Sequence, residues 1–426
     1  MTIASEPLYV RPEQLCVGVF VELDLDWLEH PFPFNRFRIK SLAQLEALKL
    51  LGLKRFRVDP LRSTSPILPS VVSIDRTFAP EPAEQVDGEA ALAGSEINQA
   101  KLQRLERIKV RHHAVDECEK AFRSASKDLR SIQNNIYAKP EASIERARAL
   151  VSRLIQTSIS DREVTLSLMN NKLASGEVYE HAMNVMVLAL VVGQQLGLQG
   201  ESLQTLGIGC IFHDLGKTLI SPSITNKFPP LTPHEQKALN QHVELGVEVG
   251  GRLGLEQGIL QIIAQHHERA DGSGFPNRLK DDAICLAARI VCVVNDFDHL
   301  CNPLNPLLAM TPHEALKLMY AKRLKEYSPI VISQFIRSMG IYPPGTLVVL
   351  NNGTQGLVLS VNTEHPLMPT VMVYDGSVPR RDAIVLDLTE EADVAIDRAV
   401  KKSALPLEVV AYLNPRNRVS YFTQEQ

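Results

Sequence analysis

Between residues 139 and 340 the sequence reads as helix after helix, and ionisable side chains recur inside its most apolar stretches. Apolar residues follow the helical period, turns bearing Gly or Pro separate the segments, and no convincing strand pattern interrupts them. Five histidines and several acids fall on the apolar segments between residues 181 and 267. Burying so many ionisable groups without a compensating cation would be very costly. The pattern therefore predicts an all-α core built around a shared cationic centre.

The regions on either side have other periodicities, and 426 residues are enough for two to four domains. Residues 1–60 predict a small α+β domain, with a Val-rich strand in 14–24, a helix from Ser41 to Gly52 and a returning strand at 56–60. Residues 61–95, rich in Pro, Ser, Ala and Glu, predict a flexible linker. Residues 341–426 have period two and predict a small β-rich unit, with a turn at 351–353.

Residues 96–138 predict one long helix with a heptad seam between residues 105 and 136. Two partners for this seam are open: a second copy of the chain in a coiled-coil homodimer, or the chain's own helical domain, which we favour. The seam consists of apolar residues with a single histidine among them: Leu105, Ile108, His112, Val115, Cys118, Phe122, Ala125, Leu129, Ile132 and Ile136.

Composition narrows the function classes. The formal net charge of −4 gives no reason to expect nucleic acid or an anionic membrane as a partner. The N-terminus lacks a signal-peptide pattern, and the longest apolar stretch, Val185 to Gly193, is too short to span a membrane. None of the six cysteines forms a C-x-x-C pair, which is typical of buried thiols in a reducing compartment. We therefore expect a cytoplasmic protein.

Five separated motifs carry the candidate chemistry. Glu177 and His181 are four residues apart and share a helix face, whereas adjacent residues point about 100° apart. A His-Asp or His-His pair therefore serves two neighbouring ions more easily than one, which predicts a multi-metal cage in a helical bundle. Imidazole with carboxylate favours Fe, Mn, Zn or Ni over Ca. The motifs are Glu177 with His181, His213 with Asp214, His242, His266 with His267, and Asn295 with Asp296 and Asp298.

Lys217 stands three residues after Asp214, on the same side of a helix, and we expect it to meet a phosphate oxygen or to protonate a leaving group. The other seven histidines lack such context and are expected to be surface or structural residues: His30, His112, His113, His234, His299, His313 and His365.

The run His213-Asp214-Leu-Gly-Lys217, with His181 upstream and His266-His267-Glu-x-x-Asp-Gly-x-Gly-Phe-Pro downstream, resembles the HD-GYP family. These are bacterial enzymes of the HD phosphohydrolase superfamily that hydrolyse cyclic di-GMP in signalling. The resemblance covers about residues 140–340, and the segments around it are similar to a subgroup with a small N-terminal domain. It implies a multidomain chain: an HD-type helical bundle at 139–340 between the α+β domain and the β-rich unit.

The resemblance also implies roles. Asp214 would bridge two ions, and Glu177 would recruit a third. Asp214 and Lys217 would be catalytic, and two or three ions, with Fe or Mn favoured over Zn or Ni, would be bound. The implied metal ligands are Glu177, His181, His213, Asp214, His242, His266, His267 and Asn295. The implied substrate-binding residues are Lys217, Asp271, Gly272, Gly274 and Phe275.

Three positions depart from the family pattern. The name-giving tyrosine is Phe275, the usual ligand aspartate is Asn295, and the basic residues that often follow this motif are missing from 301–310. Asp296 could replace the lost carboxylate only if its helix rotated.

We expect cyclic di-GMP to be hydrolysed to pGpG, GMP or both by attack of a metal-bridging hydroxide. Two alternatives stay open: a catalytically weak cyclic-dinucleotide receptor or interaction module, and an HD hydrolase of another nucleotide. Some relatives contact diguanylate cyclase domains, which makes such a domain a candidate partner.

Overall fold

The computed structural model describes residues 8–25, 30, 32, 35–68, 106, 124–160, 178–228, 230–305, 308–362, 364–376, 378–380, 383–391 and 394–413. The chain divides into two compact units. One consists of Met1–His113 and Asp375–Ile384, and the other of Ala114–Tyr374 and Val385–Gln426.

The N-terminal unit is a small α+β domain, as predicted. Its antiparallel sheet has the order β1-β4-β2-β3, built from β1 (Leu8–Val10), β2 (Phe20–Glu22), β3 (Arg36–Arg38) and β4 (Phe56–Val58). Helix α1 (Leu42–Leu50) begins where Ser41 Oγ accepts a hydrogen bond from the Gln44 amide, at 3.2 Å. The strand predicted across 14–24 shortens to β2, and β1 and β3 were not predicted.

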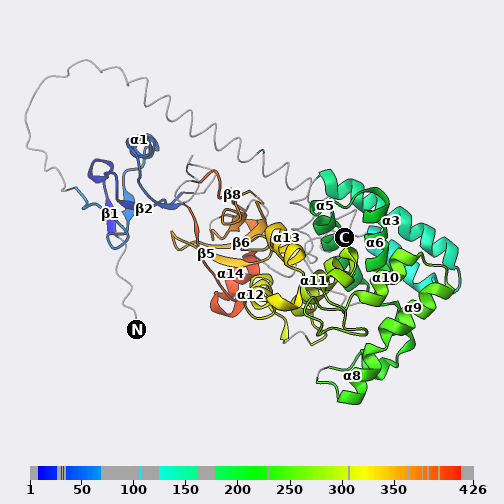
Figure 1. The fold of residues 1–426 in the computed structure, drawn as a ribbon. Coiled ribbons are helices and arrows are strands. Elements are labelled where there is room, and N and C mark those ends of the chain that lie inside the picture. Colours follow the sequence, from blue (N-terminus) through cyan, green and yellow to red (C-terminus); the bar gives the residue numbers. More distant parts are fainter. Residues whose placement is uncertain are drawn as a thin grey trace, which may run out of the picture. The chain divides into compact units, whose positions relative to one another are not determined.

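The second unit contains the helical core. Helices α5 and α6 pack on each other, α11 packs on α5, and α10 packs on α6 and α9 (Figure 1). The main helices are α3 (Pro140–Ser160), α5 (Val178–Gln195), α6 (Gly200–Phe212), α8 (Pro233–Asn240), α9 (His242–Arg252), α10 (Gln257–Gln265), α11 (Leu286–Cys301), α12 (Pro312–Lys322) and α13 (Pro329–Met339). Two shorter helical segments are η3 (Leu215–Leu219) and α7 (Pro222–Thr225).

Local sequence explains where several of these helices begin. Thr232 before α8 and Thr311 before α12 each accept a hydrogen bond from the amide three residues on, and a glutamate there reaches back to the threonine amide. A proline follows each threonine at the first helical position, where its missing N–H has no cost. These capping boxes fix where the two helices begin.

The long helix predicted for 96–138 lies largely outside the described residues. Its described part is helical over 124–135. Here the seam residues Ala125, Leu129, Ile132 and Ile136 are buried in the same core as the helices of the second unit. This part of the seam therefore packs on the chain's own helical domain, as favoured from the sequence.

The C-terminal part of this unit is an antiparallel sheet of order β8-β7-β6-β5-β9. The predicted turn at 351–353 joins the first two strands, with Leu347 opposite Leu357 and Val349 opposite Gln355. The fifth strand and the short helix after it were not predicted. The elements are β5 (Leu347–Leu350), β6 (Gln355–Ser360), β7 (Thr370–Val373), β8 (Val385–Asp387), β9 (Ile396–Ala399) and α14 (Leu407–Leu413).

Within the described ranges, no helix combines the length and the apolar character that crossing a membrane would require.

Candidate metal centre

Three buried histidines are held in one tautomer by backbone carbonyl groups at the ends of helices. The Nδ1 atoms of His213, His242 and His266 lie 2.7, 2.7 and 2.8 Å from the carbonyl oxygens of the residues three positions earlier. A carbonyl can only accept, so each Nδ1 carries the proton and each Nε2 presents a lone pair. This is the arrangement that orients metal-binding imidazoles in proteins.

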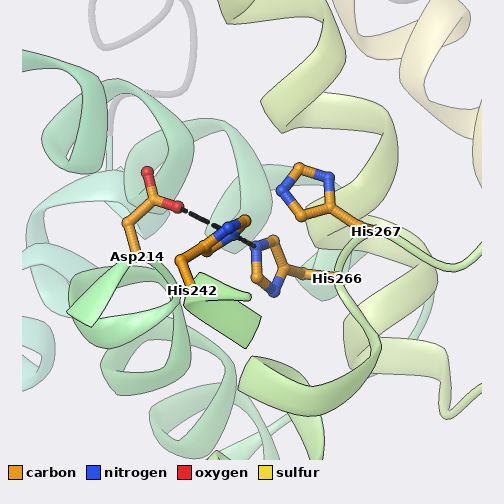
Figure 2. Close-up of side chains that lie close together, drawn as sticks. All are labelled: Asp214, His242, His266 and His267. Carbon is orange, nitrogen blue, oxygen red and sulfur yellow. Dashed lines mark hydrogen bonds and ion pairs between the residues drawn. The ribbon is translucent and has the colours of Figure 1, made fainter. Parts of the chain in front are cut away.

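Asp214 lies between two groups of imidazoles. Its Oδ2 is 3.4 Å from His213 Nε2 and 3.9 Å from His181 Nε2. Its Oδ1 is 3.5 Å from His242 Nε2 and 3.9 Å from His266 Nε2. The ligand atoms therefore form two clusters that share this carboxylate: Asp214 with His181 and His213, and Asp214 with His242, His266 and His267. Figure 2 shows the second cluster.

The close approach of η3 to α9 places Asp214 next to His242. A side chain at Gly216 would put its Cβ 2.0 Å from the His242 carbonyl oxygen and 2.5 Å from the Gly246 amide nitrogen. Both atoms are backbone and cannot rotate away. The glycine is therefore required for this spacing, which is set by packing and has no local periodic signal.

His181 comes from α5 and is oriented by a carboxylate of α11. Its Nδ1 donates a hydrogen bond to Asp298 Oδ2 at 2.6 Å, and Asn184 donates to Asp298 Oδ1 at 2.8 Å. The His181 Nε2 is then free to face Asp214. A carboxylate behind a ligating histidine raises the basicity of the imidazole and fixes its ring. The sequence placed Asp298 in the last motif without this role.

Unpartnered polar atoms show that the two clusters fit cations. Among the described residues, the buried atoms without a hydrogen-bond partner include His181 Nε2, His213 Nε2, Asp214 Oδ1 and Asn295 Oδ1. In addition, His242 Nε2 lies 3.3 Å from His266 Nε2, although both Nδ1 protons are already used. Two lone pairs facing each other repel, whereas nitrogens bound to one ion at about 2.1 Å are naturally about 3 Å apart.

The electrostatic state of the imidazoles also suits metal binding. Burial lowers the pKa of His213 to about 4 and lowers the pKa values of His242, His266 and His267 as well. These histidines are therefore neutral near pH 7 with their lone pairs available. Burial by itself would raise the pKa of Asp214, but the positive charge of Lys217 beside it holds that pKa well below its usual value. The carboxylate is therefore ionised.

Lys217 lies at the partly exposed side of the centre. Its Nζ is 2.6 Å from Asp214 Oδ2, and about a quarter of the side chain is accessible to solvent. Lys217 therefore lies beside Asp214, as the sequence predicted.

The loop after α10 carries the four other residues predicted to bind substrate. The Phe275 ring stacks on His267, with ring centroids 4.7 Å apart and an angle of 19° between the planes. Gly274 is buried, and a Cβ there would come within 2.6 Å of three backbone atoms. Gly272 has a φ of +82°, and the exposed Asp271 carboxylate accepts hydrogen bonds from Ser273. Phe275 thus adjoins the centre, whereas Asp271 and Gly272 shape the loop itself.

Two carboxylates, Glu268 and Asp296, hold this loop, a role that the sequence did not predict for either of them. Glu268 is buried and accepts hydrogen bonds from the Asn277 and Leu279 amides, at 2.7 and 2.8 Å. Asp296 binds Arg269 through both carboxylate oxygens. It also accepts hydrogen bonds from Arg323 Nη2 and Tyr327 Oη, each at 2.8 Å. Asp296 is therefore bound to residues outside the metal centre. The rotation of α11 that would bring Asp296 to the place of the carboxylate missing at Asn295 is not observed.

Glu177 lies outside the described residues, so its predicted role stays a prediction.

His299, expected to be a surface or structural residue, lies against His181 with ring centroids 4.5 Å apart. It had no motif partner in the sequence, but its position four residues after Asn295 could have indicated a shared helix face.

Comparison with known proteins agrees with this architecture. Three family models match consecutive parts of the chain: a domain of unknown function (DUF3391) at residues 9–147, an HD domain at 139–331, and a KOW domain associated with the HD domain at 347–407. The chain is 28% identical to cyclic di-GMP phosphodiesterase PA4108 of Pseudomonas aeruginosa, over 85% of this chain and 83% of that protein.

Two further relatives match a smaller share of the chain. The response regulator RpfG of Xanthomonas campestris, a cyclic di-GMP phosphodiesterase, is 32% identical over 45% of this chain and 53% of its own length. The 3'3'-cGAMP-specific phosphodiesterase 2 of Vibrio cholerae is 32% identical over 35% of this chain and 29% of its own length.

The helical fold and the two His/Asp clusters define a metal-dependent phosphohydrolase with an HD domain. With its flanking domains and its relatives, the chain belongs to the HD-GYP family of such enzymes.

Proposed function

We propose that this protein is a phosphodiesterase that hydrolyses cyclic di-GMP. The observation that carries the proposal is the position of Asp214, whose two carboxylate oxygens face separate groups of imidazole nitrogens. A pair of metal positions with one shared carboxylate suits hydrolysis of a phosphodiester, because charge must be stabilised on both the attacking and the leaving oxygen. The relatives PA4108 and RpfG, which carry this activity in their names, support the choice of substrate.

In this proposal the two clusters hold the ions through His181, His213 and Asp214 on one side and through Asp214, His242, His266 and His267 on the other. Bound ions of this kind lower the pKa of a coordinated water and polarise phosphoryl oxygens. Asn295 adds a neutral oxygen, since its Oδ1 is buried without a partner.

Lys217 would serve the substrate. Its ammonium group already lies beside the carboxylate that both clusters share, and part of its surface is accessible. It can therefore donate hydrogen bonds to a phosphoryl oxygen and supply a proton to the leaving oxygen.

The loop after α10 would bind the rest of the nucleotide. Phe275 is half-buried on His267 and offers an aromatic ring on which a base can stack. It lacks the hydroxyl of the tyrosine that gives the family its name, so any hydrogen bond from that hydroxyl is lost. Gly274 lets the loop lie close to the backbone of residues 267–269, and Asp271 and Gly272 set the shape of the loop.

A second candidate function is a cyclic-dinucleotide receptor with weak turnover. Asn295 favours it, because a neutral amide holds a cation less strongly than a carboxylate, and Asp296 does not replace it. A different cyclic dinucleotide is a third candidate, supported by the relative that acts on 3'3'-cGAMP. Contact with a diguanylate cyclase domain, and a third ion at Glu177, stay predictions.

The test uses the full chain loaded with Mn or Fe. Cyclic di-GMP and 3'3'-cGAMP are each incubated with the protein, and pGpG, GMP and the corresponding linear products are separated by chromatography. Asp214→Ala and His213→Ala are expected to abolish turnover, while the control His313→Ala, on α12, leaves it unchanged. Binding without turnover in the parent chain supports the receptor, and turnover that survives Asp214→Ala contradicts the assigned centre.

A further inference from the structure

His299 shares the bonding pattern of the three histidines whose Nδ1 atoms are held by backbone carbonyl groups. Its Nδ1 lies 2.8 Å from the Asn295 carbonyl oxygen, one helical turn earlier. The carbonyl must accept, so the proton is on Nδ1 and Nε2 presents a lone pair. In His213, His242 and His266 the same bond prepares Nε2 as a ligand.

The place of His299 relative to the centre supports the same role. Its ring meets His181 edge to face at a centroid separation of 4.5 Å, compared with 5.3 Å between His181 and His213. It also lies within electrostatic range of Lys217 and Asp214. Unlike the other imidazoles of the centre, His299 is exposed, so it lies on the side that solvent and substrate can reach.

Helix α11 lacks a metal-binding carboxylate at the position of Asn295. Asn295 provides a neutral oxygen where the sequence pattern leads one to expect a carboxylate, and Asp296 is bound to Arg269. His299 follows Asn295 by four residues and therefore projects from the same helix face. An imidazole is a stronger ligand than an amide oxygen for Fe, Zn or Ni.

We propose that His299 is an additional nitrogen ligand at the open edge of the His181 cluster, which strengthens ion binding where Asn295 weakens it. This rests on the proposed metal centre but not on the identity of the substrate. The ligand set at this edge becomes richer in nitrogen, which favours Zn, Ni or Fe over Mn.

The experiment compares three single variants of the full chain: His299→Ala, His299→Asp and His313→Ala. His313 is the matched control, because its Nδ1 also donates to a backbone carbonyl, that of Ile341, but its ring stacks on Tyr342 and not on an imidazole of the centre. Each metal-free protein is titrated with Co²⁺, and ion stoichiometry, affinity and the visible absorption spectrum are measured. Circular dichroism of each variant verifies folding.

We expect His299→Ala to weaken one Co²⁺ site about tenfold or more and to change the spectrum. His299→Asp should restore part of the affinity with an oxygen ligand, and His313→Ala should match the parent chain. Unchanged Co²⁺ affinity and spectrum in His299→Ala overturn the proposal, even if the KM for cyclic di-GMP rises, since His299 would then contact substrate only. A parent chain that binds Co²⁺ through His299 but hydrolyses no cyclic dinucleotide contradicts the proposed function and leaves this ligand in place.

Discussion

Replacing Gly216 by alanine tests whether the approach of η3 to α9 builds the metal centre. The new methyl group would lie 2.0 Å from the His242 carbonyl oxygen and 2.5 Å from the Gly246 nitrogen, well inside van der Waals contact. Neither backbone atom can move without shifting α9. The substitution should therefore separate His242 from Asp214 as well as destabilise the fold.

The magnitude follows from two opposing effects. Overpacking a close contact costs about 1–3 kcal/mol, and the upper end applies where the obstructing atoms are backbone. Replacing glycine in a helical segment recovers up to about 1 kcal/mol of chain entropy. The net loss of about 2 kcal/mol corresponds to a fall in Tm of roughly 4–8 °C for a domain of about 200 residues.

Gly251 on α9 provides the control, since a Cβ built there meets no atom within 4 Å. Gly251→Ala should leave Tm unchanged or raise it by about 1–4 °C. Thermal unfolding is followed by far-ultraviolet circular dichroism, because most helices of the described chain belong to this unit, and bound metal is measured in parallel. If Gly216→Ala and Gly251→Ala unfold at the same temperature and bind the same amount of metal, the argument from close packing is refuted.

Three further predictions concern the groups around the centre. Asp298→Asn removes the carboxylate that orients His181, so metal affinity measured by calorimetry should fall about 10- to 100-fold with the fold intact; an unchanged affinity would remove Asp298 from the centre. The buried Glu268 carboxylate accepts hydrogen bonds from two backbone amides, and Glu268→Gln would place an amide N–H₂ group against them. The substitution should lower the free energy of unfolding by about 2–3 kcal/mol in denaturant titrations. Equal stability would show that the loop has another anchor. In metal-free protein, His213 has a pKa of about 4 when folded and 6.5 when unfolded, so the unfolded chain binds more protons between these values. The stability contribution is complete above about pH 6.5 and is lost as the pH falls towards 4, so Tm measured with chelator should fall steadily over this range; a flat profile would contradict the burial of neutral imidazoles.

Much of the site was predictable because the types of residue in the motifs indicate its chemistry. The histidines and acids interrupt apolar helical segments, and buried ionisable groups need compensation wherever they occur. The pairs His213-Asp214 and His266-His267 indicated two neighbouring ions, and the structure provides two clusters with Asp214 in common. The small β strands of the N-terminal unit were harder, because three-residue strands carry too few alternations to be seen.

The sequence by itself determined which ligands are available and which segments are helical, since both follow from side-chain chemistry and local periodicity. Only the tertiary structure decided how the helices are rotated and how closely they approach. That rotation turns Asp298 towards His181 and Asp296 towards Arg269, although the two acids are two residues apart on one helix. It also brings His299 to the centre. The physical reason is that the rotation of a helix about its axis is fixed by packing against its neighbours, and no local pattern records where the neighbouring helix will lie.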